Sequence, residues 1–142
     1  MANVFDVSAY ILAKTGPISA MKLQKLIFYS QAWSLVWDDE PLFGERIEAW
    51  ANGPVCPDLY YAHQGEFTVT GEAKGDAKKL AKAQRETVDA ILKLYGKKTA
   101  HWLSDLTHRE KPWKDARKGL SDGMRSNRPI SHASMAEYYG NL

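Results

Sequence analysis

Residues 21–37, which read MKLQKLIFYSQAWSLVW, form a long helix-compatible run with apolar side chains on more than one face. With successive residues about 100° apart on a helix, two roughly opposite apolar stripes emerge, one with Leu23, Leu26 and Ile27 and the other with Met21, Phe28, Ala32 and Leu35. A helix that is apolar on two sides is typically packed between neighbours. The sequence therefore predicts a central helix around which the rest of the chain is built.

A third stripe of the same helix carries two lysines and two aromatic residues at spacings of three and four, namely Lys22, Lys25, Tyr29 and Trp33. This stripe is our first candidate for a binding surface. The alternative is structural, because lysines at the start of a buried helix often extend to solvent and a tyrosine often closes a core. The pattern alone favours the structural interpretation.

The length of 142 residues fits one domain spanning residues 1–142. Hydrophobic residues make up 44% of the chain and charged residues 25%, as is typical of globular proteins. The apolar runs are too short to span a bilayer, and the first residues lack the basic flank of a signal peptide. Cys56 is the single cysteine, and we expect it to be a small packing residue in a reducing compartment. We therefore expect a cytoplasmic protein with no membrane partner.

Capping residues predict where several helices begin, and the candidates are Asn3, Ser19, Thr99 and Ser131. The first helix is expected to end near Lys14. Pro57 and Pro112 suit the first turns of two short helices. A longer helix is expected over residues 77–95, with Gly96 as its left-handed terminator. The count of about six or seven helices predicts a mainly α, compact, multi-helix domain.

The only strand signals lie at residues 47–51, which alternate loosely in polarity, and at residues 67–70, which are aromatic and β-branched. We expect these segments to pair, so that the domain contains at most a small two-stranded β element. Asn52, Gly53 and Pro54 require a special turn, since glycine supplies backbone freedom and proline fixes the exit.

Charge is distributed unevenly, although the net charge is only +2. Residues 1–60 contain four basic and seven acidic side chains, whereas residues 74–98 contain eight basic and three acidic ones. The second region could attract nucleic acid or an acidic protein. Most lysine-rich amphipathic segments are solvated faces, however, so we do not expect nucleic acid to be the main partner.

The chain lacks the usual sequence signatures of an enzyme or a metalloprotein. Its four histidines and Cys56 show no zinc-like spacing, and neither a phosphate-binding glycine loop nor a GxSxG motif occurs. The remaining candidate is Thr107 and His108 beside Glu110, since a histidine near a carboxylate can transfer protons. A Thr-His pair at a helix end more often binds backbone carbonyls and fixes a turn, and we favour that interpretation. We expect no catalysis, no metal and no cofactor.

Four segments, taken in order, resemble one known family. They are MKLQKLIFYSQAW at residues 21–33, PLFGERIEAWANGPV at 41–55, a tyrosine-bearing segment at Leu59 and Tyr60, and LSDLTHREKPW at 103–113. The chain resembles the Panacea domain, the SocA-like antitoxin family often found in prophages, over roughly residues 18–139. The resemblance implies a mainly helical antitoxin, encoded beside a toxin, that neutralises the toxin by direct binding. It also implies that some members are adaptors that deliver the toxin to an AAA+ protease such as ClpXP.

The resemblance also marks individual positions, which we divide into two groups. The polar or amphipathic positions that are expected to face a partner are Lys22, Lys25, Tyr29, His108 and Trp113. The positions that are better explained by the core or by turns of the fold are Leu23, Leu26, Trp50, Gly53, Pro54, Thr107 and Pro112.

Three hypotheses for the function follow. The first is an antitoxin that neutralises a cognate protein toxin by direct binding. The second is a proteolytic adaptor that brings the toxin to an AAA+ protease such as ClpXP. The third is a small nucleic-acid-binding phage regulator that uses residues 74–98, although the chain shows no recognisable helix-turn-helix extension. The sequence leaves the toxin and the oligomeric state open.

Overall fold

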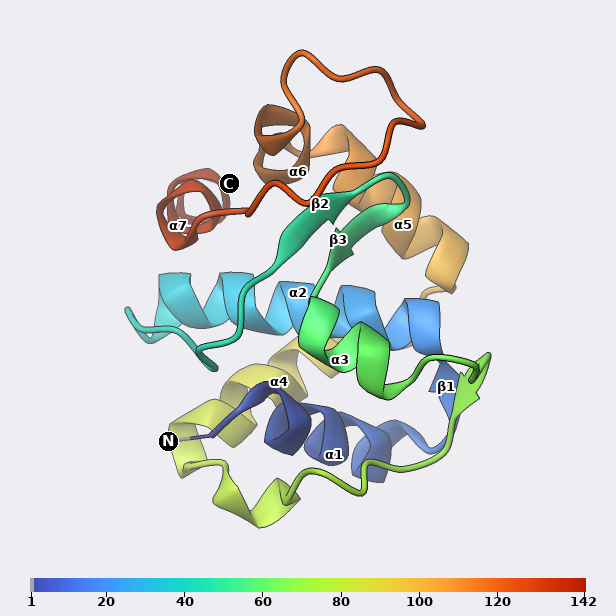
Figure 1. Cartoon of the computed structure of the whole chain (residues 1–142). Coiled ribbons are helices and arrows are strands. Elements are labelled where there is room, and N and C mark those ends of the chain that lie inside the picture. The colour runs from blue at the N-terminus through green and yellow to red at the C-terminus, as the bar shows by residue number, and fades with distance from the viewer. Residues whose placement is uncertain (1) are drawn as a thin grey trace.

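The predicted central helix is α2 (Ala20–Trp37), which crosses the middle of this computed structural model (Figure 1). The structure describes residues 2–142, so Met1 of the domain predicted over residues 1–142 lies outside the described residues. One side of α2 is covered by α1 (Val4–Thr15) and α4 (Lys82–Tyr95). The other side is covered by β2 (Glu48–Trp50), β3 (Gly53–Val55), α5 (Ala100–Arg109), α6 (Lys111–Ala116) and α7 (His132–Gly140).

Four smaller elements complete the chain, namely β1 (Ile18–Ser19), α3 (Pro57–Ala62), β4 (Thr68–Val69) and the 3-10 helix η1 (Ala77–Lys79). The described residues therefore form seven α-helices and two small two-stranded antiparallel sheets. This confirms the predicted mainly α fold. None of the helices within residues 2–142 is long and apolar enough to cross a membrane.

Helix starts agree with the predicted caps. The Asn3 side chain accepts a hydrogen bond from the Asp6 backbone, and the Asp6 carboxylate accepts one from the Asn3 backbone, each at 2.9 Å. The side chains of Ser19, Thr99 and Ser131 cap α2, α5 and α7 in the same way. These polar side chains satisfy backbone N–H groups that a helix cannot satisfy itself, so the starts are fixed by local sequence.

The two apolar stripes of α2 are both in the core. Leu23, Leu26 and Ile27 are fully buried on one stripe, and Phe28 and Ala32 are buried on the other. The prediction of a central helix packed on two sides is thus confirmed. Met21 and Trp37, which lie at the two ends of the helix, are each roughly half exposed.

Two buried glutamines of α2 bind the backbone of the segments that cross it. The amide oxygen of Gln31 accepts a hydrogen bond from Leu42 N at 2.7 Å, and its amide nitrogen donates to Phe43 O at 2.8 Å. Gln24 does the same with both backbone groups of Cys56, at 2.9 and 3.2 Å. These side chains replace the strand partner that the segments lack, because buried backbone groups need hydrogen bonds.

The predicted pairing of residues 47–51 with 67–70 is wrong. β2 pairs instead with β3, in a hairpin where Trp50 lies opposite Gly53. β4 pairs with β1, so that Val69 lies opposite Ile18. Closing a short hairpin loop costs less conformational entropy than pairing two distant segments. Gly53 has a positive φ of 120°, which provides the turn that the hairpin needs.

The helix predicted over residues 77–95 is interrupted. Asp76 caps the short η1, Leu80 is extended and buried, and α4 begins only at Lys82, where the Gln84 side chain accepts a hydrogen bond from Ala81 N at 2.8 Å. The predicted left-handed terminator is also wrong, because Gly96 has φ −62° and ψ −26°. The Lys22 ammonium donates to Gly96 O at 2.6 Å and so satisfies this helix end in another way.

Replacement of Leu26 by alanine tests the central position of α2. We expect Leu26→Ala to lower the free energy of unfolding by about 2 to 5 kcal/mol, because it leaves a cavity in a fully buried site. Leu94→Ala, the same chemical change at an exposed position of α4, should cost less than about 1 kcal/mol. Urea denaturation measures both values, and equal stability of the two variants would contradict the assignment.

Candidate functional site

A groove of about 1180 Å³ opens on the face of α2 that carries the hairpin and α3. Its walls come from the first turns of α2, the β2–β3 hairpin, α3, the segment 63–67 and residues 125–127. In Figure 1, the chain passes from β3 across the near side of α2 into α3, and the sheet formed by β1 and β4 lies beyond the end of α3. Residues that are more than 100 positions apart in the sequence therefore meet around one hollow.

Exposed apolar side chains gather at the groove. Among its lining residues, Phe67 is 85% exposed and Tyr61 is 61% exposed, while Met21 and Tyr60 are nearly half exposed. The rings of Trp50 and Tyr60 meet edge to face, with centroids 4.8 Å apart. Single exposed apolar residues are ordinary, but a cluster around a hollow is typical of an interaction site.

The exposed ring of Phe67 projects from a fixed backbone. Phe67 O accepts a hydrogen bond from Ala20 N at 2.9 Å, and Glu66 N donates to His63 O at 2.9 Å. His63 is itself buried and lies 2.6 Å from the carboxylate of Glu72, which also accepts a hydrogen bond from the Ser8 hydroxyl at 2.8 Å. The backbone that carries the aromatic rim of the groove, which we define as Tyr60, Tyr61 and Phe67, is thus fixed near Phe67 by contacts within this chain.

Lys25 also lines the groove, although only 1% of its surface is exposed. Its ammonium donates one long hydrogen bond to Pro54 O, at 3.4 Å, and forms no ion pair with the described residues. Burial disfavours the charged form and lowers the pKa of Lys25 to about 8. The floor of the groove therefore contains a desolvated ammonium with no counter-ion from residues 2–142.

Gly53 provides the space that the Lys25 side chain occupies. A Cβ atom at position 53 would lie 2.8 Å from Cε of Lys25 and 3.2 Å from the hydroxyl of Thr107. The backbone of Gly53 also has a positive φ, which disfavours any other residue. The positive φ therefore favours glycine at this position, and any larger residue would also displace the end of the Lys25 side chain.

The hairpin is fixed from the opposite side by residues of α5 and α6. The ring nitrogens of His108 lie 2.6 Å from Ser104 O and 3.2 Å from Ala51 O. The Trp113 indole donates to Trp50 O at 2.8 Å, and the buried Arg117 donates to Ala49 O at 3.0 Å. His108 binds backbone carbonyls, as in the interpretation favoured above, and lies against the ring of Trp113 with centroids 4.1 Å apart.

Glu110 joins α2 to α7 inside the core. One oxygen of its carboxylate accepts hydrogen bonds from the hydroxyls of Tyr29 at 2.5 Å and Tyr139 at 2.8 Å. Burial raises the pKa of Glu110, and the two tyrosine hydrogen bonds oppose that change. Tyr29 also stacks on Tyr95, with ring centroids 4.5 Å apart.

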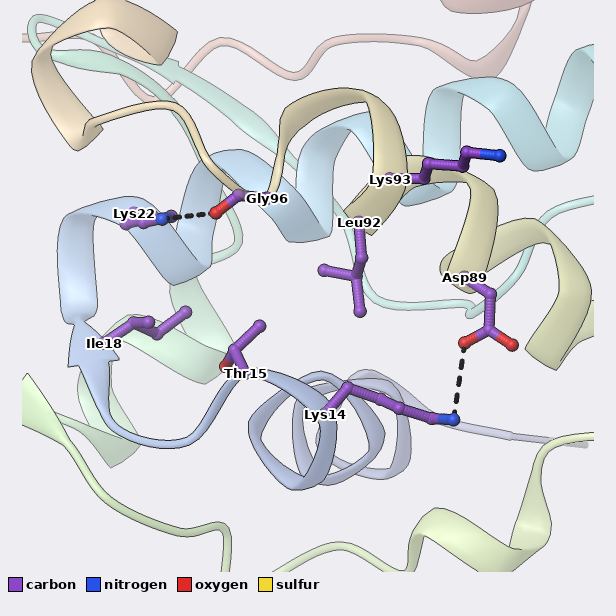
Figure 2. A pocket seen from close by; sticks show the side chains of 8 residues that line it. All are labelled: Lys14, Thr15, Ile18, Lys22, Asp89, Leu92, Lys93 and Gly96. Carbon is purple, nitrogen blue, oxygen red and sulfur yellow. Dashed lines mark hydrogen bonds and ion pairs between the residues drawn. The ribbon is translucent and has the colours of Figure 1, made fainter.

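Lys22 lies away from the groove, in a smaller hollow of about 420 Å³ between α1, the start of α2 and α4. Figure 2 shows its ammonium directed at Gly96 O, while Lys14 on the opposite wall faces Asp89 at 3.9 Å. Lys22 is therefore engaged by the end of α4 and does not share a surface with Lys25.

The five residues expected to face a partner do not form one exposed surface. Lys25, Tyr29 and Trp113 are buried. The β2–β3 hairpin lies against Lys25, and α4 and α7 pack over Tyr29. Trp113 of α6 is covered by its contact with the hairpin. Lys22 and His108 are half-buried. A role of these five residues in partner binding stays a prediction.

The second group of predicted residues occupies the core and the turns. Leu23 and Leu26 are fully buried, Trp50 is half-buried, and Gly53 and Pro54 form the start of β3. Thr107 donates its hydroxyl to Ser104 O at 2.7 Å, and Pro112 lies in the first turn of α6.

The exposed apolar residues of the groove were not singled out from the sequence. The short helix predicted to begin near Pro57 runs through Tyr60 and Tyr61, and two adjacent aromatic side chains of a helix cannot both face the core, so the sequence does contain a signal for their exposure. Phe67 was assigned to an expected strand pair, and the wrong pairing hid its exposure.

Comparison with known proteins identifies a family. The family model described as antitoxin SocA-like, Panacea domain, matches residues 23–114. No curated protein and no solved structure matches the chain. Within residues 2–142, no group of three or more His, Cys, Asp or Glu side chains could hold a metal ion.

Stability as a function of pH tests the state of Lys25. Below about pH 8 the folded protein holds a desolvated ammonium, at a cost of about 3 kcal/mol. As the pH rises from about 8 to about 10.5, the folded lysine loses its proton before the unfolded one, so its contribution to stability increases. Lys25→Met should therefore raise the free energy of unfolding at pH 7 by up to about 3 kcal/mol, and this gain should vanish near pH 10.5. Urea denaturation of both proteins measures the difference, and a variant less stable than the parent at pH 7 would contradict it.

Glu110→Gln tests the buried carboxyl group. Because the pKa of Glu110 is raised on folding, its contribution to stability is complete below the ordinary glutamate pKa and is lost as the pH rises through the folded pKa. The amide oxygen of glutamine can still accept both tyrosine hydrogen bonds. We expect the stability advantage of Glu110→Gln over the parent to grow from pH 4 to pH 8 in thermal melts. Glu137→Gln, the same change at an exposed position, should show no such trend. If the stabilities of Glu110→Gln and the parent change with pH in parallel, the raised pKa of Glu110 is refuted.

Proposed function

Because the chain belongs to the antitoxin SocA-like family of Panacea domains, we propose that it neutralises a protein toxin by binding the toxin in the groove beside α2. The observation that carries this proposal is the cluster of exposed aromatic residues at the groove. Tyr60, Tyr61 and Phe67 lie within the matched residues 23–114. The proposed mode of action is binding, without catalysis.

The physical properties of the groove suit a protein partner. Aromatic side chains are enriched at the centres of protein interfaces, where they bury much apolar surface and lose few rotamers. The backbone near Phe67 is held by hydrogen bonds and by the nearby His63–Glu72 contact, so little backbone entropy is lost there on binding. The groove also has polar groups at its edge, from Asn52, Gln64 and Asn127, which can pair with a partner backbone.

The basic region of residues 74–98 gives less support to nucleic-acid binding. Lys82 forms an ion pair with Glu86, four residues further along the same helix, at 4.0 Å. Part of the positive charge is therefore compensated on the same helix, α4. Lys98 lies over the ring of Trp102, at 4.7 Å from its centroid.

Removal of the exposed rings tests the proposed surface. Tyr61→Ala and Phe67→Ala should each weaken binding by at least about tenfold, since truncation of a central aromatic contact commonly costs about 2 kcal/mol. The readouts are growth rescue on co-expression with the toxin encoded beside this chain, and co-purification of the two proteins. Trp102→Ala removes an equally aromatic, partly exposed residue of α5 outside the groove and should leave both unchanged.

Thermal melts show whether each variant is folded. A folded Tyr61→Ala, Phe67→Ala double variant that rescues growth and co-purifies like the parent would refute the proposed surface. Growth rescue measured in cells with and without ClpX distinguishes occlusion of the toxin from its delivery to the protease. Occlusion of the toxin works in both strains, whereas delivery to that protease works only in the first.

A further inference from the structure

Lys25 has binding capacity that the fold does not use. An ammonium group has three N–H donors, and the described residues occupy one of them, by the 3.4 Å contact with Pro54 O. That distance is at the long end for a hydrogen bond. No carboxylate of residues 2–142 is paired with Lys25, and the side chain lines the groove while 99% of its surface is covered.

We propose that the groove takes up one acidic side chain, an aspartate or a glutamate, from an apolar segment of the toxin, and that Lys25 is the ion-pair partner of this carboxylate. The inference rests on the proposed function and adds the chemistry of the contact. The carboxylate supplies the missing counter-ion, and the apolar residues on either side of it pack against the aromatic rings of the rim.

The surroundings of Lys25 favour a single carboxylate over a more highly charged ligand. Besides Lys25, the groove is lined by the carboxylates of Glu48 and Glu66 and by the guanidinium of Arg125. The two carboxylates oppose the entry of a phosphate backbone or of a run of acidic residues, and one cation at Arg125 does not outweigh them. Glu48 is already paired with Arg46 at 2.6 Å and with the Trp50 indole at 2.8 Å, so it leaves Lys25 free.

Formation of this ion pair does not require the desolvation of Lys25, because folding has already desolvated it. An ion pair is weakened by the need to remove water from both charges. Lys25 has lost its water in the free protein, and the lowered pKa of about 8 is the sign of that loss. Only the acidic side chain of the toxin remains to be desolvated.

The test compares Lys25→Met with the parent chain by calorimetric titration of the purified toxin encoded beside this chain. Methionine has similar length and no charge, and it relieves the buried charge, so the fold is retained. At pH 7 the variant should bind at least about tenfold more weakly than the parent. Between pH 7 and pH 9 the affinity of the parent should fall by about tenfold, because Lys25 must regain its proton to bind. The affinity of Lys25→Met should not show this fall, because the variant has no amine at position 25. Any pH dependence that the variant does show comes from other titrating groups of the groove and of the toxin, and it is subtracted from that of the parent.

A second measurement leaves the fold of this chain untouched. Each aspartate and glutamate of the toxin is changed to its amide, and the loss of affinity is measured against both the parent and Lys25→Met. We expect one toxin carboxylate whose removal weakens binding to the parent by tenfold or more but hardly affects binding to Lys25→Met. If each carboxylate-to-amide change in the toxin lowers the affinity for the parent and for Lys25→Met by the same factor, the proposed ion pair is refuted.

The outcomes separate this inference from the proposed function. If Tyr61→Ala and Phe67→Ala weaken binding while Lys25→Met binds the toxin as tightly as the parent, with the same pH dependence, the ion pair is refuted and the groove remains the binding surface. If neither the aromatic variants nor Lys25→Met changes the affinity, both proposals are refuted.

Discussion

The fold depends on hydrogen bonds from side chains of α2 to the backbone of segments that have no regular partner. Gln24 binds both backbone groups of Cys56, Gln31 binds Leu42 and Phe43, and Ser34 donates to Glu40 O at 2.8 Å. An apolar helix could bury the same area, but it would leave these backbone groups unsatisfied inside the protein. The polar residues of the central helix thus decide which segment crosses it and where.

Local signals in the sequence predicted where the helices begin, whereas contacts between distant residues determined the strand pairing and the end of α4. Asn3, Ser19, Thr99 and Ser131 cap helices because each bonds to a backbone group three residues away. The partner of residues 68–69, by contrast, lies about 50 positions earlier in β1, and nothing in either short segment specifies the other. The end of α4 is similar, since the contact that replaces a left-handed glycine comes from Lys22.

For the candidate site, helical periodicity placed residues on a common stripe but could not tell what would cover that stripe. Lys25 and Tyr29 do lie on one side of α2, yet the hairpin covers the first, and Tyr95, Glu110 and Tyr139 surround the second. Gly53 was assigned to a turn, and its second role, to make room for Lys25, depends on a contact 28 positions away that no local pattern encodes. Exposure is a property of the whole packing arrangement, so the aromatic rim could be recognised only in three dimensions.

The attachment of the hairpin has a consequence for synthesis of the chain on the ribosome. The carbonyl of Asn52 accepts a hydrogen bond from the Ser104 hydroxyl, which is translated 52 residues later. The carbonyl of Ala49 accepts one from Arg117, which is translated 68 residues later. Residues 125–127, which close one wall of the groove, are translated later still. A nascent chain therefore cannot complete this groove until residues 125–127 have left the ribosome tunnel. A chain that stops before residue 125 lacks one wall of the groove, even though the α2 helix that the groove lies against has already been made.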